Sequence, residues 1–334
     1  MTIITNISTE FDEDWNERLI SDQNATVHQT SDFGEFQCKR QNQPTYYITF
    51  KEDNEIVGQL VLLKISRIEW KFQNQMRKYS ILSKLIKSMK NLKPMYIWYY
   101  GPAIFDTTKK NEIFKEISKL TKKFNAPIRG SLRPLDSPTS ELINNNWIEN
   151  KKGTFLVDLS EPLETLWDNI NKQSGRKAVN RAKKRGIKVK EIKNLDDLKI
   201  HHELLQQGRE MAKMVGPPFE QTKLRWESLK NVGSKGFIAY LDEKPVASTL
   251  LTSFNGYINE QGFARSKLDR DELLNGTDAI KWHIIEWGAN SNCKIFDLSG
   301  VEVDLSNGKN EGIFKFKKKW GGKYQDWYNY SFNP

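Results

Sequence analysis

The order of apolar and polar positions in the first 150 residues predicts a mixed α/β unit. Two runs of alternating residues, joined by the polar turn 51–54, are typical of a β-hairpin. Apolar residues then recur at helical spacing between residues 111 and 124. In chain order we expect two short helices within residues 10–40, hairpin strands over 46–50 and 56–65, a strand over 95–104, a helix over 111–124 and an extended segment over 127–134.

The same order of elements returns after residue 150. A strand over 155–159 is followed by Ser160, which we expect to cap a helix with Pro162 in its first turn. The later expected elements are hairpin strands over 237–241 and 246–253, a strand over 257–264, a helix over 276–290, and strands over 294–298 and 324–332.

The two series can be overlaid at a constant offset of 190 residues. At that offset the matching pairs are Ile48/Ile238, Phe50/Tyr240, Glu52/Asp242, Ile56/Val246 and Leu60/Leu250. A repeated order of hairpin, strand, helix and strand implies two similar α/β domains. Each resembles half of the acyl-CoA N-acyltransferase (GNAT-like) fold. We therefore expect tandem duplicated GNAT-like domains over 1–150 and 151–322, each a mixed sheet flanked by helices, with the strand 323–334 packing back onto the first.

Composition indicates the kind of partner. The 334 residues carry a formal net charge of +10, which favours nucleic acid, nucleotides or an anionic membrane surface. Joint richness in Lys, Asn and Ile also arises from an AT-rich genome without functional cause. Two distant cysteines, Cys38 and Cys293, argue against a disulfide framework. Because we find neither a signal peptide nor a membrane-spanning apolar run, we expect a soluble, cytoplasmic protein.

The segment 172–190 has the strongest charge pattern in the chain. It contains nine basic residues and no acidic one. Basic residues recur at helical spacing, among them Lys177, Arg181 and Lys184, so much of the charge lies on one helix face, and Gly186 ends the helix before a strand. Two interpretations stay open, a solvated basic helix and a phosphate-binding face.

The segment 312–322, GIFKFKKKWGG, combines lysines, aromatic residues and flanking glycines. Its alternation predicts a strand with Phe314 and Phe316 on one face and Lys315 and Lys317 on the other. Such a lysine can bind an anion or a developing oxyanion. The alternative is a basic surface strand. Asp297, at the end of an apolar strand, lies where α/β folds place ligand sites, although capping of the next turn explains it equally well.

Several familiar motifs are absent from the sequence. It contains no G-x-G-x-x-G, no P-loop and no G-x-S-x-G element, and its four histidines lack metal-ligand spacing. We also find no Gln/Arg-x-x-Gly-x-Gly/Ala turn opening a helix, which would seat the pyrophosphate of CoA. These absences argue against a metal site and against acetyl-CoA.

Taken together, these residues resemble the Fem-type (FemABX) peptidoglycan bridge aminoacyltransferases, which consist of two fused GNAT-like domains. Gly312, Phe316-Lys317 and Trp320-Gly321 resemble the family's Gly-aromatic-x-Phe-Lys-x-x-Phe/Trp-Gly signature. Further similar segments are SGRKAVNRAKKRGIKV, FARSKLDR with Arg265, FDLSGVE with Asp297, and HQTSDFGEFQCK near Lys39.

The resemblance implies transfer of an amino acid from aminoacyl-tRNA to an amine on a peptidoglycan precursor, without metal or other cofactor. Lys317 would stabilise the tetrahedral intermediate or hold the tRNA end, and Phe316 would fix it. The substrates and their phosphates would bind at Lys39, Arg176, Lys177, Arg181, Lys184, Arg265 and Asp297. Some members carry a precursor-binding lysine where this chain has Gln37, so Lys39 would have to replace it.

The resemblance also bears on partners and shape. The segment between Gly186 and Phe237 is too short for the family's helical arm, so the chain resembles the armless type. We expect a monomer that contacts a membrane surface at most peripherally. Two alternatives remain: an acyl-CoA-dependent N-acyltransferase on the same fold, and a non-catalytic tRNA- or nucleic-acid-binding protein.

Overall fold

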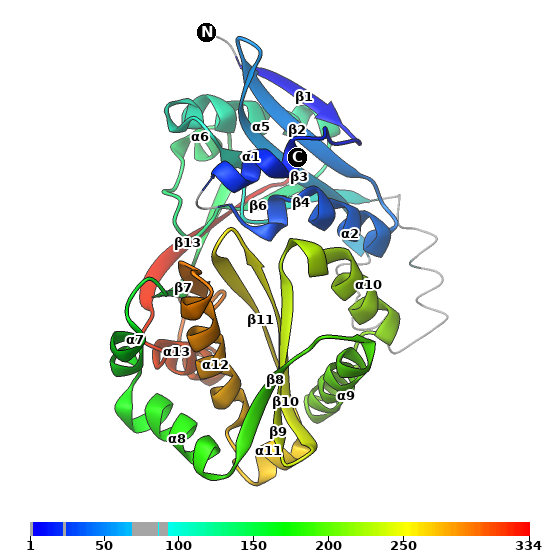
Figure 1. Ribbon diagram of the computed structural model, residues 1–334. Coiled ribbons are helices and arrows are strands. Elements are labelled where there is room, and N and C mark those ends of the chain that lie inside the picture. Colours follow the sequence, from blue (N-terminus) through cyan, green and yellow to red (C-terminus); the bar gives the residue numbers. More distant parts are fainter. Residues whose placement is uncertain (1–2, 23–24, 69–85, 87–92) are drawn as a thin grey trace. The chain divides into compact units, whose positions relative to one another are not determined.

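The computed structural model describes residues 3–22, 25–68, 86 and 93–334, and its chain divides into two compact units (Figure 1). Unit 1 comprises Met1–Lys152 and Asp326–Pro334, and unit 2 comprises Gly153–Gln325. Both units are mixed α/β, so the predicted fold class is confirmed. No helix among the described residues is long and apolar enough to cross a membrane.

Unit 1 is built on a sheet with the strand order β1-β2-β3-β4-β6-β13. β4 and β6 run parallel, and the other neighbours are antiparallel. Apolar residues of α5 pack on one face of this sheet. The elements are β1 (Ile4–Ser8), α1 (Trp15–Ser21), η1 (Val27–Gln29), α2 (Ser31–Gln41), β2 (Thr45–Glu52), β3 (Glu55–Ser66), β4 (Pro94–Trp98), β5 (Ala103–Ile104), η2 (Thr107–Lys109), α5 (Lys110–Phe124), β6 (Ile128–Ser131), α6 (Ser140–Ile143) and, ending the chain, β13 (Lys323–Phe332).

Unit 2 repeats this plan with the strand order β7-β12-β11-β10-β9-β8. β11 and β12 run parallel, as β4 and β6 do. The elements are β7 (Ile148–Asp158, which begins in unit 1), α7 (Leu163–Asn169), a π-helical turn (Lys172–Arg176), α8 (Lys177–Lys184), β8 (Ile187–Glu191), α9 (Leu195–Met211), α10 (Phe219–Leu229), η4 (Lys230–Val232), β9 (Ser234–Leu241), β10 (Lys244–Phe254), β11 (Tyr257–Arg265), α11 (Lys267–Asp271), α12 (Gly276–Asn290), β12 (Ile295–Asp297) and α13 (Gly308–Lys318).

The two faces of the unit 2 sheet bury different helices. Phe237 and Ala239 on β9 share a core cluster with α12, whereas Ile238 and Tyr240 share another with α9. Neighbouring strand residues point to opposite faces, so this alternation lets one strand serve two cores.

The repeat is real, but the offset of 190 is wrong by one residue. The two-residue turn 53–54 in unit 1 corresponds to 242–243 in unit 2, an offset of 189. Ile48 faces α5 and matches Phe237, which faces α12, rather than Ile238 on the other face. A slip of one residue exchanges the two faces of a strand. Both faces are apolar here, so residue type did not reveal the slip.

Three local predictions also need correction. The strand expected over 95–104 is broken after Trp98, where Tyr100 has a φ of 49° and Gly101-Pro102 is cis. Ser160 does not cap α7, because its hydroxyl donates to Asp158 instead, 2.6 Å away. Helices α9 and α10 were not predicted at all.

Candidate functional site

The segment GIFKFKKKWGG does not form a strand: its residues 312–318 belong to helix α13, and residues 319–322 follow the end of that helix. The side chain of Asn307 caps the helix by accepting from the backbone N–H of Lys309, 2.9 Å away. Successive helical residues are rotated by about 100°, so Lys315 and Lys317 do not share a face. Lys315 is exposed and pairs with Glu311 one turn away, whereas Lys317 is only partly exposed.

Lys317 is held by the turn that follows β12. Its Nζ donates to the carbonyl oxygens of Ser299, at 2.9 Å, and Gly300, at 3.1 Å. An ammonium group has three protons, so one donor remains for a ligand. Ser299 adopts a left-handed conformation, with a φ of 65°, which belongs to the turn that presents these carbonyl groups.

Asp297 stabilises the same turn through hydrogen bonds to its carboxylate. Its fully buried carboxylate accepts from Thr154 Oγ1 (2.5 Å), Tyr257 OH (2.8 Å), Asn259 Nδ2 (3.2 Å) and the backbone N–H of Ser299 (2.8 Å). The structure thus brings two predicted site residues, Asp297 and Lys317, to one turn. With four donors already on its oxygens, Asp297 acts as a support for the site rather than as a ligand-binding group.

A buried ion pair that the sequence analysis missed lies beside Lys317. Lys281, on α12, is fully buried and pairs with Glu260, on β11. The Nζ of Lys281 also lies 4.7 Å from the ring centroid of Phe263 and 5.1 Å from that of Phe296. The available signal was a lysine between Ile280 and Trp282, on the largely apolar face of its helix.

Burial and neighbouring charges oppose each other at these lysines. Burial lowers the pKa of Lys317, while the carboxylates of Glu260 and Asp297 act to raise it. Burial likewise lowers the pKa of Lys281, and Glu260 opposes that effect. The site therefore holds lysines that release a proton more easily than a solvated lysine does.

Phe316 and Lys319 complete the site. Lys319 pairs with Asp278 and lies 4.4 Å from the ring centroid of Phe316, and its side chain is only 13% exposed. Lys319 is therefore not a simple surface charge. Lys318, in contrast, is exposed. The Phe316 ring lies against the Lys319 ammonium, and its centroid is 5.9 Å from the Nζ of Lys281.

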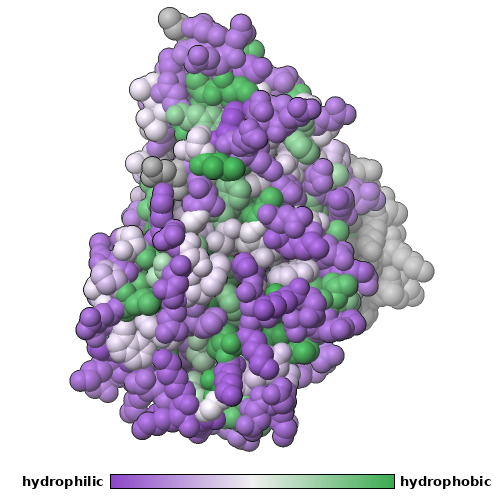
Figure 2. All heavy atoms as spheres, viewed as in Figure 1, coloured by the Kyte–Doolittle hydropathy of each residue, from purple (hydrophilic) through white to green (hydrophobic). Residues whose placement is uncertain are grey.

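Four of the predicted phosphate-binding residues meet at one surface hollow. The hollow has a volume of about 550 Å³, and no acidic residue lines it. Figure 2 shows mainly hydrophilic side chains over α8, which carries much of the lining. The lining residues are Trp167, Lys172, Gln173, Arg176, Lys177, Asn180, Arg181 and Lys184.

Two other predicted residues have different surroundings. Arg265 pairs with the fully buried Asp269, whose carboxylate also accepts from the backbone N–H of Gly276, at 2.7 Å, where α12 begins. Arg265 therefore stabilises a helix start. Lys39 belongs to unit 1, is largely exposed and lies 3.7 Å from Glu35.

The start of α12 bears on the choice of acyl donor. α12 follows β11 in the repeated order of elements, and a CoA pyrophosphate would need free N–H groups at such a helix start. Asp269 takes this position with its own carboxylate. In unit 1, Asp106 similarly caps the turn before α5, accepting from the backbone N–H of Thr108 at 2.9 Å. Both acids disfavour a second anion.

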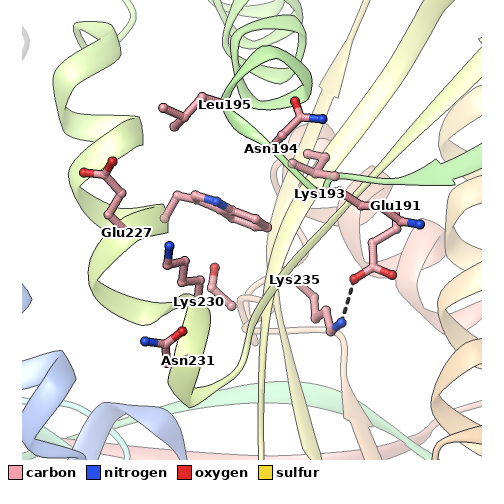
Figure 3. Close-up of a pocket in the computed structure, with 11 residues that line it drawn as sticks. Glu191, Lys193, Asn194, Leu195, Glu227, Lys230, Asn231 and Lys235 are labelled. Carbon is pink, nitrogen blue, oxygen red and sulfur yellow. Dashed lines mark hydrogen bonds and ion pairs between the residues drawn. The ribbon is translucent and has the colours of Figure 1, made fainter.

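A second hollow, of about 520 Å³, lies beside β8 at the edge of the unit 2 sheet (Figure 3). It is lined by Trp226 and by residues of mixed charge, and Lys235 and Glu191 neutralise each other at 2.6 Å. None of its lining residues comes from α13 or from the turn after β12. It is therefore separate from the Lys317 site.

Comparison with known proteins identifies the fold. No family model matches the chain, and no curated protein sequence matches it. The crystal structure of FemX matches with a TM-score of 0.71 and 12% identity, over 97% of this chain and 96% of that one. The chain has the fold of FemX.

Other solved structures share the FemX fold over nearly the full chain. L-PGS from Bacillus licheniformis matches with a TM-score of 0.56 and 11% identity, over 90% of this chain and 91% of its own. A tandem GNAT protein from the clavulanic acid biosynthesis pathway matches with a TM-score of 0.55 and 10% identity, over 99% and 98%. The predicted tandem GNAT-like architecture is thus confirmed.

Proposed function

We propose that this protein is an aminoacyltransferase that moves an amino acid from aminoacyl-tRNA to an amine acceptor, and that Lys317 is its central catalytic residue. The observation that carries the proposal is the Lys317 ammonium, anchored by two backbone carbonyl groups with one donor remaining. By family resemblance, the acceptor is a phosphate-bearing peptidoglycan precursor.

The proposed reaction needs little beyond positioning and charge stabilisation. The acceptor amine attacks the ester carbonyl of the aminoacyl-tRNA, a C–N bond forms and the negative charge collects on the carbonyl oxygen. When the intermediate collapses, the ester C–O bond breaks and the ribose hydroxyl leaves with the proton that the amine loses. The remaining Lys317 donor would stabilise the oxyanion, and Phe316 would hold the substrate against it.

Two features support aminoacyl-tRNA over acyl-CoA as donor. Asp269 disfavours a pyrophosphate at the start of α12, and Asp106 does the same at the turn before α5. The hollow at α8 gathers five basic side chains beside Trp167, a combination that suits the phosphates of a nucleic acid. FemX has the same fold, which adds weight to the assignment.

The proposal is tested by following labelled donors. Purified protein is incubated with labelled aminoacyl-tRNA or labelled acyl-CoA, together with UDP-linked peptide, lipid-linked precursor or simple amines. We expect label to pass from aminoacyl-tRNA to an amine. Transfer from acyl-CoA alone would establish the alternative donor, and tRNA binding without any transfer would establish a non-catalytic nucleic-acid-binding protein.

A matched pair of variants tests the role of Lys317. Lys317→Ala should lower kcat/KM by about 10²-fold or more, because removing one donor to a developing oxyanion typically costs that much. Lys315→Ala, two residues away on the same helix, removes an exposed lysine and should change turnover less than about twofold. Equal effects of the two substitutions would refute the proposed role of Lys317.

A further inference from the structure

Glu260 contacts the Lys317 site in two independent ways. Its carboxylate pairs with Lys281, and its backbone carbonyl accepts from the hydroxyl of Ser299. Ser299 in turn offers its own carbonyl to Lys317. A single residue of β11 thus holds both the buried cation of α12 and the turn that anchors Lys317.

A core would not need this ion pair for stability. Burying two charges costs solvation free energy, and the attraction between the charges barely offsets that cost. A protein with apolar side chains of similar size in place of the ion pair is therefore often as stable. Lys281 lies between Ile280 and Trp282, in a helix whose other buried positions are largely apolar, and it is fully buried. Packing alone therefore does not explain why a charged residue occupies position 281.

The charges around Lys317 come from four elements. Glu260 on β11 and Asp297 on β12 favour its ammonium form. The charge of Lys317 lowers the pKa of Lys281 on α12. Because repulsion between two ammonium groups is mutual, Lys281 in turn disfavours the ammonium form of Lys317. Lys319, at the C-cap of α13, is neutralised by Asp278 on α12. Glu260 and Lys281 thus act on Lys317 in opposite directions.

We propose that Glu260 and Lys281 are positioning residues that keep Lys317 in place and set its charge, with Glu260 holding it as a cationic donor and Lys281 limiting the strength of that hold. The catalytic meaning of this role rests on the function proposed above. Neither residue is assigned to contact substrate.

The test is a direct titration of Lys317, which needs no substrate. Protein labelled with ¹⁵N-lysine is titrated by NMR, and the Lys317 signal is assigned by its loss in Lys317→Ala. Glu260→Gln should lower the pKa of Lys317, and Lys281→Met should raise it. Shifts in one direction for both variants, or no shift in either, would overturn the inference.

The double variant keeps the test decisive if Glu260→Gln alone, with its unpaired buried lysine, does not fold. Glu260→Gln/Lys281→Met buries no unpaired charge and differs from Lys281→Met only in the Glu260 charge. Its Lys317 pKa should lie below that of Lys281→Met, and equal values would overturn the inference.

Activity provides a second, separable readout. If Lys317 acts as a cation, the alkaline limb of the kcat/KM profile should move down in pH for Glu260→Gln and up for Lys281→Met, in step with the NMR titration. If the wild-type protein transfers no aminoacyl group, the proposed function is overturned, but the titration still tests whether Glu260 and Lys281 act on Lys317. If the protein is active but neither substitution changes the pKa of Lys317, the inference is overturned and the proposed function is not.

Discussion

Thr154→Val isolates one bond of the network that supports the Lys317 turn. The Thr154 hydroxyl is fully buried, lies 2.5 Å from Asp297 Oδ1 and, at 2.9 Å, also approaches the carbonyl of Ser299. Valine keeps the shape of threonine but removes the donor. A hydrogen bond to a charged group contributes about 1.5–3 kcal/mol, so we expect the free energy of unfolding to fall by about 2 kcal/mol. For a unit of this size, that corresponds to a decrease in Tm of about 4–8 °C.

Thr252→Val is the matched control. Thr252, on β10 of the same unit, is equally buried, but its hydroxyl has no hydrogen-bond partner among the described residues. Removing it should leave stability unchanged or raise it by about 1 kcal/mol. Urea unfolding followed by circular dichroism measures both variants, and any unfolding of unit 1 contributes equally to each. Equal destabilisation by the two substitutions would show that the Asp297 network contributes nothing specific.

Two further predictions concern α8 and α9. If α8 binds tRNA phosphates, Lys184→Ala should weaken tRNA binding and reduce the slope of the logarithm of the binding constant against log salt by about 0.7–0.9. Lys188→Ala, which lies outside the hollow, should change neither quantity. Equal effects of the two substitutions would exclude α8 as the contact. Burial lowers the pKa of His201 from its usual 6.5 to about 4. As the pH falls, the unfolded state therefore takes up a proton before the folded state does. Stability falls between pH 6.5 and 4, by about 3 kcal/mol in total. Urea midpoints across this range should fall less steeply for His201→Gln, and parallel slopes would contradict the assignment.

The sequence predicted those elements that show a regular apolar periodicity or a polar turn between two apolar runs. Helix 276–290 was predicted with its observed bounds, and both hairpins were predicted because polar turns separate alternating runs. The prediction for the α13 segment was wrong because its F-K-F-K alternation mimics a strand. In the helix, Phe314 packs against Phe155 while Phe316 faces Trp320 one turn later, a tertiary arrangement that alternation does not encode.

The candidate site was predictable only in part. Lys317 and Phe316 were found through a motif, and the basic face of α8 through its charge spacing. The ion pair of Glu260 and Lys281 joins residues 21 positions apart on a strand and a helix, so nothing local relates them. Arg265 looked available in the sequence because its partner Asp269 becomes buried only when α11 and α12 form.

The chain course through β13 has a consequence for biosynthesis. The residues Asp326–Pro334 that complete the unit 1 sheet are translated after all of unit 2. Until they leave the ribosome, β6 has an open edge where β13 will pair, with Gly130 and Ser131 awaiting Tyr330 and Asn329. Such an edge is a template for wrong strand pairing. Unit 2 is continuous in sequence, so the unit translated second can be completed first.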